Sequence, residues 1–524
     1  MTANLAFPLY RHSLERPDAL ALSVAGRDLS YAELAALSRL IAGYLRPLAR
    51  SRRVGILASR SLAACAGILA TAWAGSTYVP LSLKLPEARL AALLEALDLD
   101  ALIVDGRGLS LLTPAVLAAA PKHILTSDDA APAAVDADVR RFSSLREDGP
   151  AVPAAITADH LGYIEFTSGT TGLPKGVMVP ARAVNHYIAA MQDWFALATD
   201  DRAAETCDIT FDLSVHNMFW TWSAGAALFV MTPLQMVAPA RFIRDRAITS
   251  WLSVPSIIAL MRQNRTLLPD SLPSLRLSFF CGEALPVGAA RAWQAAAPNS
   301  RVENLYGPTE ATIACLRQPV VEPIATTPNR EIVAIGAAYP GMTVGIIDSD
   351  HRPMPVGKPG EIALSGAQLA DGYFGQPDLT ESRFPIIGGQ RWYLTGDLGV
   401  EDDHGLFHHL GRIDNQVKVQ GNRIELEEIE MHLRTASGSD HVAAVAWPLV
   451  DGAAKGIVGF STDASASEDA IKQRLRQHLP GYMIPSAIHA VDDLPLNGNG
   501  KVDRKALLAL LDAGRFATVL EAAQ

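Results

Sequence analysis

The 524-residue sequence has only four cysteines, at positions 65, 207, 281 and 315, and none of them forms a Cys-x-x-Cys pair. No histidine stands at a zinc-like spacing from them, so neither a disulfide framework nor a zinc module is indicated. Lysine and arginine number 45 against 55 aspartate and glutamate, and no long basic run occurs. The net charge of −10 argues against binding to nucleic-acid phosphates. The composition predicts a reduced, cytoplasmic protein with no nucleic-acid partner.

The distribution of charged and apolar residues also indicates neither a signal peptide nor a membrane span. The N-terminus carries Arg11 and Glu15 and has no basic start followed by an apolar stretch. The most apolar window, residues 62–79, is rich in Ala, Gly, Ser and Thr. Its hydrophobicity is too low for a span of ~20 residues. We expect a buried helix and strand there, and no membrane partner.

Apolar runs alternate with helical patterns over most of the first 320 residues. Strand-like runs at 54–57, 101–104 and 228–231, with a helical pattern at 85–97 near them, predict βαβ units and parallel sheets. Between 330 and 410, strands punctuated by Gly and Pro predict a small β-barrel or distorted sheet. After Asp414 the pattern predicts a separate α+β unit, with Ser465 and Glu468 forming a capping box on a helix that follows.

A strand ending near Phe166 leads into a segment rich in glycine, hydroxyl groups and lysine. Its candidate phosphate-binding residues are Thr167, Ser168, Gly169, Thr170, Thr171, Gly172 and Lys175. Glycines let backbone N–H groups approach phosphate oxygens, hydroxyls donate hydrogen bonds, and lysine adds positive charge. The spacing is not that of a Walker A loop, so P-loop NTPase mechanisms do not apply.

In these motifs the chain resembles the adenylate-forming enzymes, which include acyl-CoA synthetases, luciferases and the adenylation domains of nonribosomal peptide synthetases. The likeness follows the family's order along nearly the whole chain, at residues 29–34, 74–81, 167–176, 211–214, 304–310, 393–398, 411–414, 479–485 and 499–504. It is greatest toward stand-alone amino-acid-activating members. The resemblance implies an α/β fold in which a large N-terminal domain, residues 1–413, contains two βαβ-type subdomains and a small β-barrel. A small, mobile α+β C-terminal domain, residues 414–524, would follow.

The resemblance also implies residues that bind ATP and Mg²⁺. Lys501, Thr309 and Glu310 are the expected catalytic residues, and Glu310 offers the hard oxygen ligand that Mg²⁺ prefers. Asp397, assisted by Arg412, would accept hydrogen bonds from the ribose hydroxyls. Tyr306 would stack on adenine and Asn304 would contact the base amine. The remaining nucleotide-binding positions are Gly282, Glu283, Gly307 and the loop from Thr167 to Lys175.

The resemblance implies that Asp212 binds the ammonium of an amino-acid substrate, a role that suits a buried carboxylate, which is costly unless a cation meets it. A partner inside the protein is the alternative. The other implied pocket residues are Leu213, His216, Leu252, Phe279, Cys281, Leu305, Ile313 and Ala314. They are mostly apolar and several are bulky, which predicts a small cavity without a second charge. L-proline is the favoured substrate and an alanine-like amino acid is next. His216 either hydrogen-bonds a polar substrate or packs in the core.

The acceptor of the activated acid has to be inferred indirectly. No carrier-domain motif is found, and His408-His409 does not make a condensation motif because Asp414 falls at the wrong spacing. We expect a free-standing enzyme that loads the phosphopantetheine thiol of a discrete carrier protein in natural-product biosynthesis, such as that of antibiotics. The resemblance implies a hinge at Asp414 that exchanges Lys501 for residues 418–421. Two alternatives remain: a ligase that uses free CoA, and a catalytically silent binding module.

Overall fold

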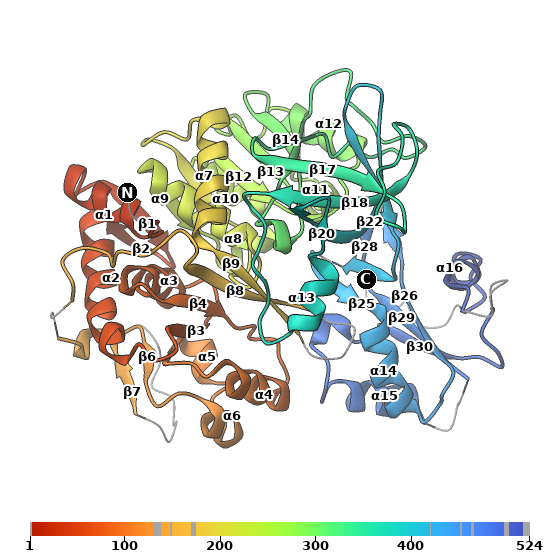
Figure 1. Cartoon of the computed structure of the whole chain (residues 1–524), viewed down its shortest axis with the longest axis horizontal. Helices are drawn as coiled ribbons and strands as arrows, with labels where there is room; N and C mark the ends of the chain where they lie inside the picture. The colour runs from red at the N-terminus through yellow and green to blue at the C-terminus, as the bar shows by residue number, and fades with distance from the viewer. Residues whose placement is uncertain are drawn as a thin grey trace. The chain divides into compact units, whose positions relative to one another are not determined.

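The computed structural model describes residues 3–128, 138–146, 149–168, 174–419, 421–450, 453–462, 466–496 and 502–516. The chain forms two compact units. The first comprises residues 1–83, 91–166 and 175–413, and the second comprises residues 84–90, 167–174 and 414–524. Figure 1 shows the α/β character of the large unit and the α+β character of the small one, which confirms the expected fold class.

A nine-stranded mixed sheet forms one half of the large unit. In sheet order its strands are β16 (Ala337–Ala338), β15 (Leu316–Pro319), β14 (Arg301–Tyr306), β13 (Leu277–Phe280), β12 (Ser250–Ser253), β10 (Arg202–Glu205), β11 (Ala227–Val230), β1 (Leu20–Val24) and β2 (Arg27–Ser30). The strands from β14 to β1 pair in parallel, and the edge strands pair antiparallel. Its central strands are buried apolar runs, as expected for parallel strands covered on both faces.

Helices accompany this sheet between its strands. They are α7 (Ala181–Phe195), α8 (Leu213–Val215), α9 (Thr221–Ala224), α10 (Pro239–Asp245), α11 (Ser256–Gln263) and α12 (Val287–Ala296). A single π-helical stretch, His216–Trp220, joins α8 to α9. Because parallel strands end on a common edge, the residues that follow β12, β13 and β14 gather there.

The second sheet has eight strands. In order they are β19 (Gly372–Tyr373), β9 (Lys175–Pro180), β8 (Leu161–Thr167), β4 (Thr77–Pro80), β3 (Arg53–Leu57), β5 (Ala101–Val104), β6 (Ile124–Thr126) and β7 (Val139–Arg141). Its helices are α1 (Phe7–Glu15), α2 (Tyr31–Leu45), α3 (Leu62–Ala74), α4 (Glu87–Leu97), α5 (Gly106–Leu109) and α6 (Pro114–Ala119). Figure 1 shows β3, β4 and β8 side by side near α2 and α3.

The apolar window at 62–79 is the helix α3 followed by β4, as the sequence predicts. Every residue of α3 is buried, so the helix can be apolar on all sides. The helix begins at Ser61, whose side chain accepts the Ala64 N–H, and ends at Gly75 in the left-handed conformation. Within the described ranges, we find no helix with the length and hydrophobicity needed to cross a bilayer.

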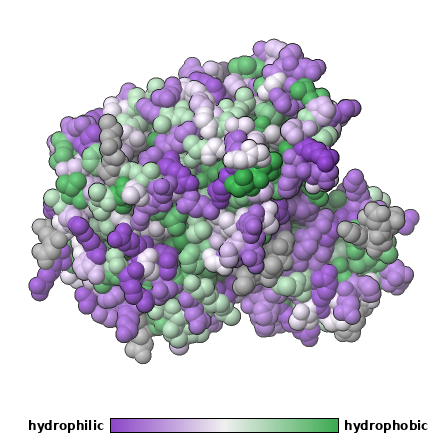
Figure 2. Space-filling model, in the orientation of Figure 1, coloured by the Kyte–Doolittle hydropathy of each residue, from purple (hydrophilic) through white to green (hydrophobic). Residues whose placement is uncertain are grey.

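Of the two forms expected for residues 330–410, a small β-barrel or a distorted sheet, the structure has an open four-stranded sheet and no closed barrel among the described residues. Its strands are β17 (Met342–Ile347), β18 (Gly360–Gly366), β22 (Tyr393–Glu401) and β23 (Phe407–Arg412), next to the hairpin β20 (Ile386–Ile387) and β21 (Gln390–Arg391) and the helix α13 (Pro377–Arg383). Between residues 174 and 419 the outer strands β17 and β23 do not pair with each other, so the sheet is not closed. On the mostly polar face drawn in Figure 2, a green patch lies over β20, where Ile386 is exposed.

The small unit contains two further sheets. One has the order β25 (Asn422–Glu425), β24 (Gln416–Val419), β28 (Ala453–Ala454) and β27 (Leu449–Val450), and the other has β26 (Val442–Ala446), β29 (Ile457–Ser461) and β30 (Ala487–Ala490). Its helices are α14 (Leu426–Ser437), α15 (Glu468–Leu475) and α16 (Arg504–Asp512). The predicted capping box is wrong, because α15 begins at Glu468 and the Ser467 side chain caps it; Ser465 lies outside the described residues.

Candidate functional site

A buried carboxylate, Asp397, lies where β22 and β23 run side by side. Register pairs Asp397 with Arg412 across the two strands. The Arg412 guanidinium donates to the Asp397 Oδ1 at 2.8 Å and to the Thr395 carbonyl at 2.8 Å. His409 Nε2 lies 3.3 Å from the same carboxylate oxygen, and the Tyr306 hydroxyl donates to the other. The structure therefore brings together three residues predicted for nucleotide binding and adds His409.

These neighbours keep the Asp397 carboxylate ionised. Burial alone would raise the pKa of Asp397. The hydrogen bond and charge of His409, the charge of Arg412 and the Tyr306 hydroxyl outweigh it and hold that pKa well below its usual range. An ionised carboxylate only accepts hydrogen bonds, so it suits a pair of O–H donors such as a ribose diol.

On β14 of the nine-stranded sheet, Asn304 has a buried acceptor with no partner among the described residues. It lies on β14, and its Nδ2 donates to the Ala334 carbonyl at 2.8 Å, which sets the orientation of the amide. The Asn304 Oδ1 is buried and has no hydrogen-bond partner among the described residues. Leaving a buried acceptor unpaired costs free energy. A donor such as the amine of a purine base would satisfy it.

Gly282 and Glu283 follow β13 at the same edge. Gly282 has φ of +88°, a conformation that favours glycine. The Glu283 Oε2 accepts the Ser256 N–H at 2.9 Å, so this carboxylate holds the start of α11. Both predicted residues therefore lie near the ends of the parallel strands, where ligands bind in open α/β sheets.

Glu310 is fully buried in the short 3₁₀ helix Thr309–Ala311 that follows β14. The Tyr373 hydroxyl donates to the Glu310 Oε1 at 2.8 Å, and the Ala370 N–H donates to the Glu310 carbonyl at 2.9 Å. No cluster of three or more metal-binding side chains occurs in the described part of the chain. A single carboxylate is compatible with Mg²⁺, which is commonly held by one or two carboxylates together with substrate phosphates.

Asp212 is buried just before α8, and its carboxylate meets a strained backbone. The Ile313 N–H donates to the Asp212 Oδ2 at 3.2 Å. Ile313 and Thr312 both have positive φ, +69° and +57°, which is unusual for β-branched residues. Such strain collects at ligand sites when the surrounding structure holds it in place. A side chain at Gly307 would meet the Ala314 Cα at 2.5 Å, so only glycine allows this close approach.

The other predicted pocket residues are all buried, and most of them are aliphatic: Leu213, His216, Leu252, Phe279, Cys281, Leu305, Ile313 and Ala314. His216 lies among the rings of Trp220 and Phe279, at centroid distances of 4.9 and 5.5 Å. Its Nδ1 is 2.7 Å from the Tyr187 hydroxyl, and burial lowers the pKa of His216 to about 3. His216 is therefore a neutral core histidine with a protein partner.

A second carboxyl group, Glu165, lies behind Asp212. It is buried on β8, and its Oε1 accepts the Asp212 N–H at 3.1 Å. Burial and the charge of Asp212 raise the pKa of Glu165 well above its ordinary value of 4.5. The hydroxyls of Tyr78 and Tyr163 are buried nearby and have no hydrogen-bond partner among the described residues. Glu165 thus holds the Asp212 backbone, and burial favours the protonated form of its carboxyl group.

Several predicted residues cannot be placed in this geometry. Lys501 and the loop residues Gly169, Thr170, Thr171 and Gly172 lie outside the described residues. Thr167 ends β8, Ser168 follows it, and Lys175 begins β9 and is buried. Asp414 begins the main segment of the small unit, where its carboxylate accepts the Gln416 N–H at 3.1 Å. Their roles stay predictions.

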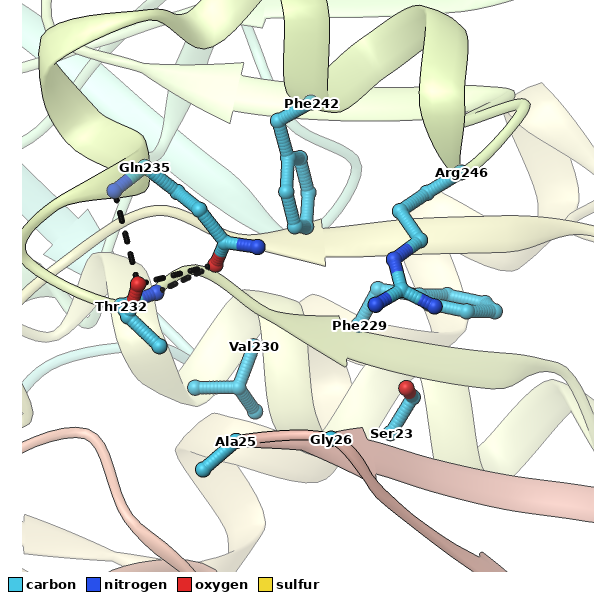
Figure 3. A pocket seen from close by; sticks show the side chains of 9 residues that line it. All are labelled: Ser23, Ala25, Gly26, Phe229, Val230, Thr232, Gln235, Phe242 and Arg246. Atoms are coloured by element: carbon cyan, nitrogen blue, oxygen red, sulfur yellow. Dashed lines mark hydrogen bonds between the residues drawn. The ribbon is translucent and has the colours of Figure 1, made fainter.

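A separate cavity of about 340 Å³ lies beside the neighbouring strands β1 and β11 of the nine-stranded sheet (Figure 3). Its lining residues are Ser23, Ala25, Gly26, Phe229, Val230, Thr232, Gln235, Phe242 and Arg246. The Thr232 and Gln235 side chains hydrogen-bond each other at 3.1 Å on its wall. None of the predicted site residues lines this cavity, so it is not the site built around Asp212 and Asp397.

Sequence reasoning missed His409, Glu165 and Tyr373. A charged residue inside the apolar strand Tyr163–Phe166 was a usable signal for Glu165, because carboxyl groups are rarely fully buried without a partner. His409 lies three residues before Arg412 on one strand, yet only the pairing of β22 with β23 places it near Asp397. No local signal marks Tyr373.

Comparisons with known proteins show the family of this chain. The family model described as AMP-binding enzyme matches residues 9–374, and the model of the AMP-binding enzyme C-terminal domain matches residues 428–501. Enterobactin synthase component F of Escherichia coli is 33% identical over 517 residues, covering 94% of this chain. The match spans only 38% of that longer protein.

Two solved structures extend the likeness to the fold. The Vibrio cholerae adenylation domain AlmE, in complex with glycyl-adenosine-5'-phosphate, is 34% identical with a TM-score of 0.88, and 98% of each chain is covered. Holo-PA1221, a nonribosomal peptide synthetase protein containing adenylation and PCP domains, is 26% identical with a TM-score of 0.79, covering 97% of this chain and 84% of that one. The chain therefore belongs to the AMP-binding family of adenylate-forming enzymes and is similar to the adenylation domains of nonribosomal peptide synthetases.

Proposed function

We propose that this protein activates a small, uncharged amino acid with ATP, forming an aminoacyl adenylate and pyrophosphate. The observation that carries the proposal is Asp212, a buried carboxylate beside an apolar pocket and a strained N–H. A substrate ammonium would meet the charge that burial makes costly. Glu165 holds the backbone of Asp212, and burial raises the pKa of its carboxyl group, which disfavours a second negative charge beside the pocket.

The nucleotide is assigned to the residues at the edge of the nine-stranded sheet and at β22 and β23. Asp397 would accept the ribose hydroxyls, and the unpaired Asn304 Oδ1 would accept the base amine. Tyr306 would lie along the base while its hydroxyl remains available to Asp397. Glu310 would help to hold Mg²⁺, which supplies positive charge to the phosphate oxygens.

The first reaction joins the amino acid to the nucleotide. A carboxylate oxygen of the substrate bonds to the α-phosphorus of ATP, and the bond from that phosphorus to the leaving phosphate oxygen breaks, which releases pyrophosphate. Negative charge shifts between two anions during this step, so a cation near them stabilises the transition state. We assign that role to Lys501, with Thr309 and the phosphate-binding loop assisting.

The size of the pocket limits the substrate. Leu252, Phe279 and Leu305 are buried side chains that leave little room for a long or aromatic substrate. The glycyl adenylate bound by the similar AlmE supports a small amino acid here. Proline remains the first expectation from sequence and alanine the second, and glycine joins them on this similarity.

The second proposed reaction transfers the aminoacyl group to the phosphopantetheine thiol of a carrier protein. The thiol sulfur attacks the acyl carbon, AMP leaves, and the thiol proton is released. The likeness to a protein that contains adenylation and PCP domains supports a carrier rather than free CoA. We propose that the carrier is a discrete protein and that the small unit, from Asp414 onward, turns between the two reactions.

The test is amino-acid-dependent pyrophosphate exchange with Mg-ATP across the twenty common amino acids, β-alanine and small aryl acids. We expect the largest signals from proline, alanine or glycine. Exchange only with aryl or aliphatic acids lacking an amine would refute the role of Asp212. Loading of a holo carrier protein added in trans, measured beside loading of CoA, distinguishes the carrier-dependent enzyme from the CoA ligase.

A further inference from the structure

The strained turn that follows Glu310 is held by one buried side chain, Gln368. It lies in the loop between β18 and β19 and is fully buried. The Gln368 Nε2 donates to three carbonyl oxygens of the turn, at 3.2 Å to Ala311, 3.2 Å to Thr312 and 2.8 Å to Ala314. Two hydrogens thus serve three carbonyl oxygens of the turn, of which the Thr312 carbonyl also accepts the Ala314 N–H at 2.9 Å.

The contacts run in both directions between this loop and the turn. The Thr312 hydroxyl donates to the Gln368 carbonyl at 2.7 Å. On the far side, His186 Nδ1 lies 3.1 Å from the Gln368 Oε1. Because the Gln368 amide nitrogen serves the turn, its oxygen is the acceptor for His186. His186, on α7, thereby sets the orientation of the amide.

The turn that Gln368 holds presents the groups that face the substrate pocket. Thr312 and Ile313 keep positive φ, and the Ile313 N–H reaches the Asp212 carboxylate because of that conformation. Without the three hydrogen bonds, β-branched residues would relax toward negative φ. The Ile313 N–H would then point away from Asp212, and the wall made by Ile313 and Ala314 would move.

Residues that follow Gln368 also hold Glu310, which we assign to Mg²⁺. The Ala370 N–H donates to the Glu310 backbone carbonyl, and the Tyr373 hydroxyl, on β19, donates to the Glu310 carboxylate. These bonds do not involve the Gln368 side chain. Replacing Gln368 should therefore affect the amino-acid pocket and leave the support of Glu310 in place.

We propose that Gln368 is a positioning residue for amino-acid recognition, which holds the Ala311–Ala314 turn in its strained form so that Ile313 orients Asp212. This inference rests on the proposed function, because it assigns Asp212 to the substrate amine. Gln368 does not touch the substrate, so its effect should reach binding only through the turn.

The test compares Gln368→Met with wild type in pyrophosphate exchange, using the amino acid that gives the largest wild-type signal. Methionine has a similar length but no amide. We expect the KM for the amino acid to rise about tenfold or more, while the KM for ATP changes less than about threefold. The matched control is Gln294→Met on α12, which removes one amide-to-carbonyl hydrogen bond, to Val320, far from this turn. It should leave both KM values unchanged.

Rescue separates positioning from a general packing role. Asparagine has nearly the volume of threonine and adopts positive φ far more readily. Adding Thr312→Asn to Gln368→Met should therefore lower the KM for the amino acid at least about threefold relative to Gln368→Met alone, because the turn then needs less support. A double variant no better than Gln368→Met would overturn the proposal, and so would equal rises in both KM values.

A milder variant keeps the test decisive if Gln368→Met does not fold. His186→Leu removes the partner of the Gln368 Oε1 and should raise the KM for the amino acid by a smaller factor, again without changing the KM for ATP. An unchanged amino-acid KM in this variant would count against the proposal. If the wild-type protein catalysed no pyrophosphate exchange with any acid tested, the proposed function itself would be refuted.

Discussion

Replacing Glu205 with glutamine should stabilise the protein at pH 8 and leave its stability nearly unchanged at pH 5. Glu205 is buried at the end of β10, and its Oε1 accepts hydrogen bonds from the Asn217 side chain at 3.0 Å and the Cys207 N–H at 2.8 Å. Burial raises the pKa of Glu205 from 4.5 to about 8, although these hydrogen bonds oppose the rise. Glutamine keeps an oxygen acceptor for both donors and cannot ionise.

The direction follows from proton binding. Between pH 4.5 and about 8 the folded protein keeps a proton on Glu205 that the unfolded chain releases. The free energy of unfolding therefore falls as the pH rises through this window. Each pH unit inside it costs about 1.4 kcal/mol. From pH 5 to pH 8 the advantage of Glu205→Gln over wild type should grow by about 3 kcal/mol.

Urea unfolding followed by tryptophan fluorescence measures this difference, because Trp220, Trp222 and Trp251 are buried in the same unit as Glu205. Comparing the variant with wild type at each pH cancels the titration of other groups, including Glu165. Glu381→Gln, at an exposed position on α13, is the matched control and should show no such trend. An equal stability difference at pH 5 and pH 8 would refute the assignment of a neutral Glu205.

Three further predictions concern the site. Asp212→Asn should raise the KM for the amino acid by about a hundredfold in pyrophosphate exchange. An unchanged KM would refute the assignment of the substrate ammonium to Asp212. Asp397→Asn should raise the KM for ATP about tenfold or more while sparing the KM for the amino acid, since it removes the charge that Arg412 meets. Glu165→Gln should behave nearly as wild type in the same assay, whereas Glu165→Leu should weaken amino-acid binding; equal loss in both would mean that Glu165 acts through its charge.

Much of the fold follows from local patterns. The apolar runs at 54–57, 101–104 and 228–231 are the strands β3, β5 and β11, because buried parallel strands need continuous apolar sequence. The window at 62–79 is a buried helix and strand for a similar reason. Local patterns do not reveal which strands pair, so the open order of β17, β18, β22 and β23 could not be told from a barrel in advance.

The same distinction between local patterns and contacts distant in sequence applies to the site. Asp212, Asp397 and Glu310 were predicted from motifs, whereas their supports come from elsewhere in the chain. Glu165 reaches Asp212 from β8, and Gln368 reaches the turn after Glu310 from the loop behind β18. Such contacts join residues about fifty apart in sequence, and no periodicity encodes them. A polar residue in an otherwise apolar segment is the one signal that sequence offers for them.

The pairing of Asp397 with Arg412 across β22 and β23 has an implication for altering this enzyme. The carboxylate assigned to the nucleotide is anchored in sheet register, where a shift of one residue would turn the side chain to the opposite face. The carboxylate of Asp212, which we assign to the substrate amine, instead depends on a short helix start and a turn. Substrate choice can therefore be redesigned by exchanging residues around that turn, while Asp397, Arg412 and the strands that pair them are left unchanged.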